Sequence, residues 1–563
     1  MIYHCEDHTC NYWDEGEKLP ERCPQCGRKL LRANEADMTG DDWTALGNTL
    51  WDAEASDKKR MVDCFRKAAY LGSAWGVCNL GICMEQGNGV EADPVQAFWL
   101  YQQAVEMGSL NAVCCLGVCY QYGIGTAPDA EKAAELYCKA AEYGSPRGQM
   151  LLARAFHDGI GVEADAAEAM HWVRAAAYQR YGEGMHRLGV CYAYGDGVEQ
   201  NWEHAVHWFR EAAESGVSVA MTDLGYCYEK GCGVEQSWEQ AFSWYRRGAE
   251  CGYPVSMSNL GLCYKRGYGV EQNWQEAIKW YEQGAQCGHL QSMNNLACCY
   301  EGGEGVEQNE ERALYWYRRG AEAGSVYCMF YLGWNYSNGV GVKQNMTEAI
   351  RWYTAAAEGG NADAMHNLGW HYDHGEGVEQ DMKKAICWYE RAAEQNHPAA
   401  MNSLGECYAM GRGVPRDLET AMEWYRRAAE LGEAMADYNM GWHLEQAGKL
   451  SEAYAHYRKA ADGNDDSAWW ALGRFYENGV VVAQDGKEAR RCYETGEKLG
   501  SVKCKMRLAR CKLLGIGGRR AKKAGLDLCR QALELAKESS EKEDYGYEAE
   551  MNLLRRTIAE NES

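Results

Sequence analysis

Apolar and small residues recur along this chain with a period of 36 residues. In one period, Ala220, Leu224 and Tyr228 are spaced four residues apart, so they share one face of a helix. The Leu of this pattern, usually followed by Gly, recurs from Leu80 to Met440 at ten successive intervals of 36 residues. Degenerate copies occur at Leu46, Leu472 and Leu508. The pattern therefore predicts about 14 units.

Glycine and short polar residues mark where each helix ends and where the next one begins. After the helix around Leu224, the run Gly231-Cys232-Gly233 ends the helix, because Gly tolerates the left-handed cap conformation. Ser237 then follows as the N-cap of a second helix, which Gly252 closes. The same N-cap position is held by Asp93, Asn201, Asn273, Asn309, Asn345, Asp381 and Asp417. Each period is therefore predicted to be a helix–turn–helix hairpin.

A lone hairpin of this size cannot bury its Trp and Tyr residues, but a stack of hairpins buries one continuous core. The predicted fold class is all-α, a solenoid of about 14 hairpins that follows a small N-terminal module. Three files with one residue per repeat are expected in the core. The Met file is Met185, Met221, Met257, Met293, Met329, Met365 and Met401. The Trp file, with the aromatic residue after each member, is Trp208, Trp244, Trp280, Trp316, Trp352, Trp388 and Trp424. The Cys file is Cys83, Cys119, Cys191, Cys227, Cys263, Cys299, Cys407 and Cys511.

The repeated motif resembles that of a known family. It reads Ala-x-x-x-Leu-Gly-x-x-Tyr-x-x-Gly-x-Gly-Val and then Ala-x-x-Trp-Tyr-x-x-Ala-Ala-x-x-Gly. This is similar to the Sel-one-like repeat (SLR) family, a relative of the tetratricopeptide repeats, over roughly residues 41–538. The resemblance implies a right-handed α/α superhelix whose first helices line the concave face, and an adaptor that assembles protein complexes. Residues 441–463 lack the Gly-x-Gly-Val loop and read more like a plain tetratricopeptide unit.

Four cysteines precede the repeats. Cys23-Pro24-Gln25-Cys26 has the spacing of a zinc knuckle, and Cys5 and Cys10 supply a second, looser pair. A segment of about 33 residues has too little core to fold alone, so a structural zinc ion would supply its folding energy. We predict zinc ligation by Cys5, Cys10, Cys23 and Cys26, with His8 as an alternative ligand in place of Cys5 or Cys10. A disulfide-linked segment and unliganded thiols are the other interpretations.

The predicted domain order follows from these signals. Residues 1–33 form a zinc-ribbon-like module, 34–40 a linker, 41–538 the repeat solenoid, and 539–563 a C-terminal capping helix and tail. Terminal repeats need such a cap because they must cover an apolar end.

Composition and charge narrow the classes of function. The chain is 46% apolar and carries a net charge of −24, which disfavours wrapping around a nucleic acid. There is no long uncharged apolar stretch and no signal-peptide pattern at Met1, so the expectation is a cytoplasmic protein without a membrane span. The cysteines of the Cys file are expected to be buried free thiols, which agrees with a reducing compartment.

Ligand-facing residues are assigned by analogy with the tetratricopeptide repeats. They fall two before and two after the Leu, and then five and six after it. The later half of the chain has a surplus of aromatic residues in these columns, whereas earlier repeats carry residues such as Cys78, Ile82 and Ser258 there. The predicted partner-binding residues are Phe330, Trp334, His366, Trp370, Asp373, His374, Tyr438, Trp442, Trp470 and Arg474. The alternative is that the column two after the Leu is half-buried and merely tolerates large groups.

His366, His371, Asp373 and His374 lie in one repeat and are interpreted as a polar ligand-contact patch or, alternatively, a metal site. No catalytic motif is present. The predicted function is a non-enzymatic, monomeric scaffold that binds a peptide or partner protein in its concave groove. One alternative is nucleic-acid or partner recognition through the zinc module. The other is hydrolysis of β-lactams, with which some members of the family have been credited.

Overall fold

The computed structural model of this 563-residue chain describes residues 2–5, 13–15, 30–32, 35–51, 55–542 and 548–562. It divides into two compact units, Met1–Ser292 and Met293–Ser563. The first unit begins with a three-stranded antiparallel sheet in the order β2-β1-β3. Its strands are β1 (Ile2–Cys5), β2 (Trp13–Glu15) and β3 (Leu30–Arg32), followed by the 3-10 helix η1 (Glu35–Asp37).

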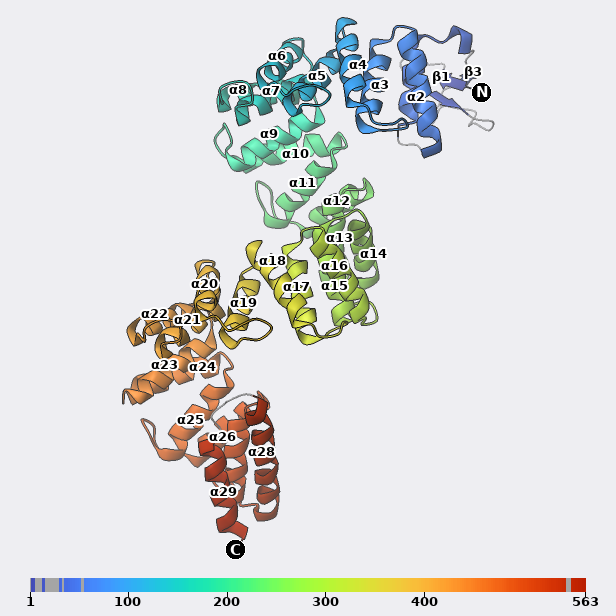
Figure 1. Cartoon of the computed structure of the whole chain (residues 1–563). Coiled ribbons are helices and arrows are strands. Elements are labelled where there is room, and N and C mark those ends of the chain that lie inside the picture. Colours follow the sequence, from blue (N-terminus) through green and yellow to red (C-terminus); the bar gives the residue numbers. More distant parts are fainter. Residues whose placement is uncertain are drawn as a thin grey trace. The chain divides into compact units, whose positions relative to one another are not determined.

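The rest of the first unit is a series of antiparallel helix pairs (Figure 1). The first helices of these pairs are α1 (Gly40–Thr49), α3 (Ala74–Gln86), α5 (Leu110–Tyr122), α7 (Pro146–Asp158), α9 (Gly182–Tyr194), α11 (Ser218–Lys230) and α13 (Pro254–Arg266). The second helices are α2 (Ala55–Tyr70), α4 (Pro94–Glu106), α6 (Ala130–Glu142), α8 (Ala166–Tyr178), α10 (Trp202–Glu214), α12 (Trp238–Glu250) and α14 (Trp274–Gln286). From α1 to α14, each helix packs against its neighbours in the chain within this unit.

The second unit continues the same pattern from within α15 and ends with one additional helix. Its first helices are α15 (Leu290–Gly302), α17 (Val326–Asn338), α19 (Ala362–His374), α21 (Pro398–Met410), α23 (Ala434–Gln446), α25 (Asp466–Asn478) and α27 (Val502–Leu514). The second helices are α16 (Glu310–Glu322), α18 (Met346–Glu358), α20 (Met382–Glu394), α22 (Leu418–Glu430), α24 (Leu450–Asp462), α26 (Gly486–Lys498) and α28 (Lys522–Lys542). The last helix, α29 (Glu548–Glu562), packs on α27 and α28. The described ranges thus contain fourteen helix pairs and α29.

The predicted helix ends are confirmed. All eight predicted N-cap residues precede a second helix, and each accepts a hydrogen bond from a backbone N–H of its first turn. Gly231 caps α11 in the left-handed conformation, with φ at +73°. Gly233 is required for a second reason, because a Cβ there would collide with the carbonyl oxygen of Trp202 in the preceding pair. The short unit is also confirmed, since only Ala447, Gly448 and Lys449 separate α23 from α24.

The core between the two helices of a pair is built on the Leu-Gly slot. Leu368 of α19 is 1% exposed, and Gly369 lets the ring of Tyr389 from α20 lie directly on the backbone. A Cβ at Gly369 would stand 2.7 Å from Cδ1 and Cε1 of that ring. The aromatic residue after each Trp of the file is buried in the same way, and these residues are Phe209, Tyr245, Tyr281, Tyr317, Tyr353, Tyr389 and Tyr425. The steric fit of a ring against a glycine therefore fixes how each pair closes.

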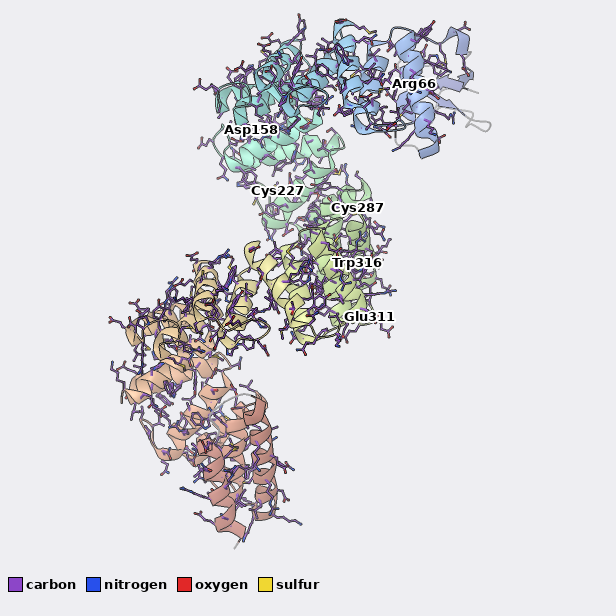
Figure 2. The ribbon with its side chains drawn as sticks, viewed as in Figure 1. Arg66, Asp158, Cys227, Cys287, Glu311 and Trp316 are labelled. Carbon is purple, nitrogen blue, oxygen red and sulfur yellow. The ribbon has the colours of Figure 1, made fainter. Side chains whose placement is uncertain are left out.

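The prediction that the Trp file belongs to the core is only partly confirmed, because most of its members lie at the edge of the core. Trp244 is buried, but the other six tryptophans are only half-buried. Trp316 on α16 is one of them, and its side chain is labelled in Figure 2. The reason is that successive residues of a helix are rotated by about 100°, so the Trp lies at the edge of the second helix when the Tyr faces inward. An arginine covers many of these rings, and the guanidinium carbon of Arg391 lies 4.3 Å from the ring centroid of Trp388.

The Met and Cys files agree with the prediction of a core position. All methionines of the Met file are buried except Met329, which is half-buried. The eight cysteines of the file are buried as well. Burial raises the pKa of the Cys83 thiol to about 11 and that of Cys227 to about 12, so these groups stay protonated at neutral pH. Among the described helices, none has the combination of length and apolar composition that crossing a bilayer needs.

Candidate protein-binding surface on the first helices

The column two residues before the Leu lies between successive first helices. Its side chains form hydrogen bonds with a residue 37 positions later, on the next first helix. The pairs are His186 with Asp223 (2.6 Å), His366 with Ser403 (3.3 Å) and Asn402 with Asn439 (3.0 Å). This column is therefore engaged in the stack itself and offers little surface to a partner.

The column two residues after the Leu is open in the second unit. The exposed fractions of its tryptophans are 38% for Trp334, 38% for Trp370 and 42% for Trp442. The hollow beside Trp334 and Trp370 measures about 320 Å³, so it would hold only one or two side chains of a partner. Its lining includes Asn338 and Glu376. Large rings exposed beside a hollow of this kind are typical of hot spots in protein interfaces.

A local contact holds one of these rings, that of Trp370, in place before any partner binds. The imidazole of His374 stacks on the indole of Trp370, with centroids 4.3 Å apart and an interplanar angle of 23°. Nδ1 of His374 also lies 2.9 Å from the carbonyl oxygen of Trp370. Rings that are already fixed lose less conformational entropy when they are buried.

Other predicted site residues lie inside the protein. Asp373 is 4% exposed, and its Oδ1 accepts a hydrogen bond from Nη1 of Arg412 at 3.0 Å. His366 is enclosed between helices, where burial and the neighbouring His397 lower the pKa of its imidazole to about 4. His366 is therefore neutral at neutral pH. Across the described ranges there is no cluster of His, Cys, Asp and Glu that could hold a metal ion, so the structure gives no support to a metal at the histidine-rich repeat.

Phe330 and Tyr438 lie on first helices and are half-buried against the core. The ring centroid of Phe330 lies 6.0 Å from that of Tyr353, and Tyr438 lies 5.6 Å from Tyr457. Burial raises the pKa of Tyr438 to about 12. Their aromatic character is explained by packing, which is the role that the sequence analysis had not assigned to them.

Trp470 and Arg474 are engaged by other parts of the chain. The indole N–H of Trp470 donates to Oε1 of Glu550 on α29 at 3.3 Å. The guanidinium of Arg474 lies 4.6 Å from the Trp470 ring and donates to Glu445 at 2.9 Å. The last helix of the chain thus contacts the end of the column, and the open part of the predicted site reduces to Trp334, Trp370, His374 and Trp442.

Two surface features of the first unit are not predicted from the sequence. Tyr226 and Leu262 hold the position two after the Leu, and they are 46% and 40% exposed. A second hollow, of about 330 Å³, lies on α7, α8 and α9, and its lining includes Arg154, His157 and Asp158. Asp158 is labelled in Figure 2. The sequence does carry a signal for this hollow, because these three residues hold the columns two, five and six after Leu152, but none of them is one of the large aromatic residues that mark the predicted site.

Comparison with known proteins identifies the repeat. The Sel1 repeat family matches twelve segments, 76–109, 112–145, 146–181, 182–217, 218–253, 254–289, 290–325, 326–361, 362–397, 398–433, 434–465 and 468–501. The predicted count of about 14 is therefore higher than the family match. The pairs α1–α2 and α27–α28 have the hairpin structure but lie outside the matched segments, because their sequences depart from the motif.

Solved structures show the same relationship. c5321, described as a protective antigen of uropathogenic Escherichia coli with an SLR fold, is 29% identical and covers 76% of this chain and 94% of its own, with a TM-score of 0.57. A Sel1 repeat protein from Oxalobacter formigenes is 26% identical and covers 57% of this chain and 95% of its own, with a TM-score of 0.42. No curated protein is significantly similar in sequence. Because the family match extends over far more than half of its length, this chain belongs to the Sel1 repeat family.

Proposed function

We propose that this chain is a non-enzymatic scaffold that binds an extended peptide or a helix of a partner protein on the first helices of its second unit. The observation that supports the proposal is the exposed file of Trp334, Trp370 and Trp442. Membership of the family supports it as well, since Sel1 repeat proteins typically act as protein-interaction scaffolds. The two alternatives, nucleic-acid recognition and β-lactam hydrolysis, stay predictions that no observation favours, as do the monomeric state and the cytoplasmic location.

Exposed tryptophans give such a surface its affinity. An indole buries a large apolar area and has few rotatable bonds, so a partner that covers it gains about 25 cal/mol per Å² of apolar surface. In alanine scans, an anchoring Trp contributes about 2 kcal/mol or more. The half-buried Phe330 and Tyr438 support the helices beneath this surface and are not part of it.

Alanine substitution tests the proposal. We expect Trp370→Ala and Trp442→Ala each to weaken partner binding by about 30-fold, which corresponds to about 2 kcal/mol. The partner is first captured on the intact chain from a lysate of the source cells and identified by mass spectrometry, and dissociation constants are then measured with the purified partner. Trp388→Ala is the matched control, because it removes a half-buried indole from a second helix.

Two outcomes would contradict the proposal. One is partner affinity that is unchanged in both first-helix variants. The other is a large fall in the midpoint of thermal unfolding for Trp370→Ala, which would show that this ring stabilises the fold and does not serve recognition.

We also propose that residues 1–33 hold a structural zinc ion. Cys10, Cys23 and Cys26 lie outside the described residues, and only the backbone of Cys5 is described. The strand register supports the proposal, because it pairs His4 with Trp13 and Cys5 with Leu30. The last residues of β1 and the first residues of β2 and β3 therefore lie at the same end of the sheet. Cys10 and Cys26 are within four residues of these starts, a reach of at most about 14 Å.

Zinc would be expected to fold this segment and to take no part in catalysis, since four protein ligands leave no open position. The purified chain should contain one zinc per molecule by elemental mass spectrometry, and Cys23→Ser together with Cys26→Ser should abolish it. Cys251→Ser, at an exposed cysteine of the repeats, is the control and should retain the metal. A chain purified without chelators that contains no zinc would contradict the proposal.

A further inference from the structure

Two cysteines of the first unit hold a pair of positions whose side chains meet elsewhere in the stack. Cys78 on α3 is two residues before its Leu, and Cys115 on α5 is 37 residues later. Residues with the same spacing and slots are in hydrogen-bond contact at three other places, of which His186 with Asp223 is the shortest at 2.6 Å. Cys78 and Cys115 are also joined by one hydrogen-bond network, in which Asn111 contacts Cys78 and Arg147 contacts both Asn111 and Cys115. They are 0% and 5% exposed.

Polar groups surround this thiol pair and distinguish its two members. Nη1 of Arg147, on α7, donates to Sγ of Cys115 at 3.5 Å and to Oδ1 of Asn111 at 2.7 Å. The Asn111 amide in turn donates to Sγ of Cys78 at 3.6 Å. The guanidinium of Arg147 therefore contacts Cys115 directly and is linked to Cys78 through Asn111.

The two thiols differ in acidity as a result. Interaction with the neighbouring Cys78 thiol, together with the charge of Arg147 and against the effect of burial, lowers the pKa of Cys115. Interaction with Cys115, together with burial, raises the pKa of Cys78. At Cys83, by contrast, burial is the cause of the shift and raises the pKa of the thiol to about 11. Cys115 is thus suited to act as the nucleophile and Cys78 as the resolving thiol.

We propose that Cys78 and Cys115 form a reversible oxidation site that a hydroperoxide converts into a disulfide between α3 and α5. The Cys115 thiolate attacks the terminal peroxide oxygen, the O–O bond breaks, and the leaving alkoxide or hydroxide takes up a proton. Cys115 is then a sulfenic acid. The Cys78 sulfur attacks the Cys115 sulfur, an S–S bond forms, and water leaves with the Cys78 proton. Two thiols are oxidised, and the hydroperoxide is reduced to an alcohol or water.

Peptide mapping after treatment of the full-length chain with hydrogen peroxide tests this site. A cross-linked peptide pair that contains Cys78 and Cys115 is expected under non-reducing conditions, and dithiothreitol should remove it. Cys78→Ser should leave Cys115 as a sulfenic acid that dimedone traps. Serine is tolerated at this slot, because Ser258 holds the equivalent position and is buried. Cys83 with Cys119 is the internal control, since both are buried in equivalent repeats and should not become linked.

The role of Arg147 as a positioning residue is tested by the pH dependence of the rate. Arg147→Met should slow disulfide formation about tenfold at pH 7, and the difference from the unchanged chain should shrink at pH 9, where most thiols ionise without assistance. A purely structural effect would slow the reaction equally at both values. The proposal is overturned if exposed Cys251 is oxidised while Cys115 stays reduced, or if Cys78 and Cys115 are never linked.

Discussion

Replacement of Tyr389 with alanine is expected to destabilise the α19–α20 pair by about 3–5 kcal/mol, the usual cost of removing a fully buried aromatic side chain. The ring is 1% exposed and lies on the backbone of α19 at Gly369. Its removal leaves a cavity that the two helices cannot close without moving Leu368 as well. Because each repeat is stabilised mainly by its neighbours, the loss should weaken α17–α18 and α21–α22 too.

Two matched variants separate the ring from its hydroxyl and from its neighbour. The Tyr389 hydroxyl donates to Oδ2 of Asp373 at 3.5 Å, a long hydrogen bond, so Tyr389→Phe should cost about 1 kcal/mol or less. Trp388→Ala removes a half-buried ring from the same helix and should cost much less than Tyr389→Ala.

Native-state hydrogen exchange is the appropriate measurement, because a long repeat array need not unfold in a single step. The quantity compared is the free energy of local opening for amides of α19 and α20. Equal losses of this free energy in Tyr389→Ala and Trp388→Ala would contradict the assignment of the residue after each Trp to the core and of the Trp file to its edge.

Replacement of Glu550 with alanine is expected to destabilise the docking of α29 by about 3 kcal/mol or more, because it leaves a buried arginine with one carboxylate fewer. Glu550 is 7% exposed. Its Oε1 accepts hydrogen bonds from Nη2 of Arg507 at 2.7 Å and from the indole N–H of Trp470 at 3.3 Å. Arg507 retains only Glu477, at 3.3 Å, which Arg510 also contacts.

The exchange rates of amides in α29 report this effect directly. In Glu550→Ala they should rise by about two orders of magnitude, which corresponds to about 3 kcal/mol. Exposed Glu548 lies on the same helix, and Glu548→Ala should leave the rates almost unchanged. Protection of α29 that is equal in the two variants would show that its apolar contacts, such as those of Leu554, suffice to hold it.

Much of the fold follows from the sequence because its constraints are local. A helix end at Gly231 and a helix start at Ser237 depend on the conformational freedom of glycine and on one side-chain hydrogen bond. The 36-residue period then fixes which residues of successive repeats face one another. These constraints need no knowledge of distant parts of the chain.

The candidate site was only partly predictable for a physical reason. His366 and Trp370 are four residues apart and share a helix face, so the sequence alone does not tell which of them the next helix covers. The tilt between successive first helices decides this, and it covers the position two before the Leu. Trp470 with Glu550 is a contact across 80 residues outside the periodic pattern, so the repeat gives no signal for it.

The most direct test of the proposed binding surface is site-specific photo-crosslinking from the two helices of a repeat. A photoreactive phenylalanine analogue is placed at Trp370 or Trp442 on the first helices, and at Trp388 or Trp424 on the second helices, of the otherwise intact chain. We expect the identified partner to be cross-linked through Trp370 and Trp442 and through neither of the second-helix positions. Cross-links that form only from Trp388 or Trp424 would contradict the central claim that the partner is bound by the first helices.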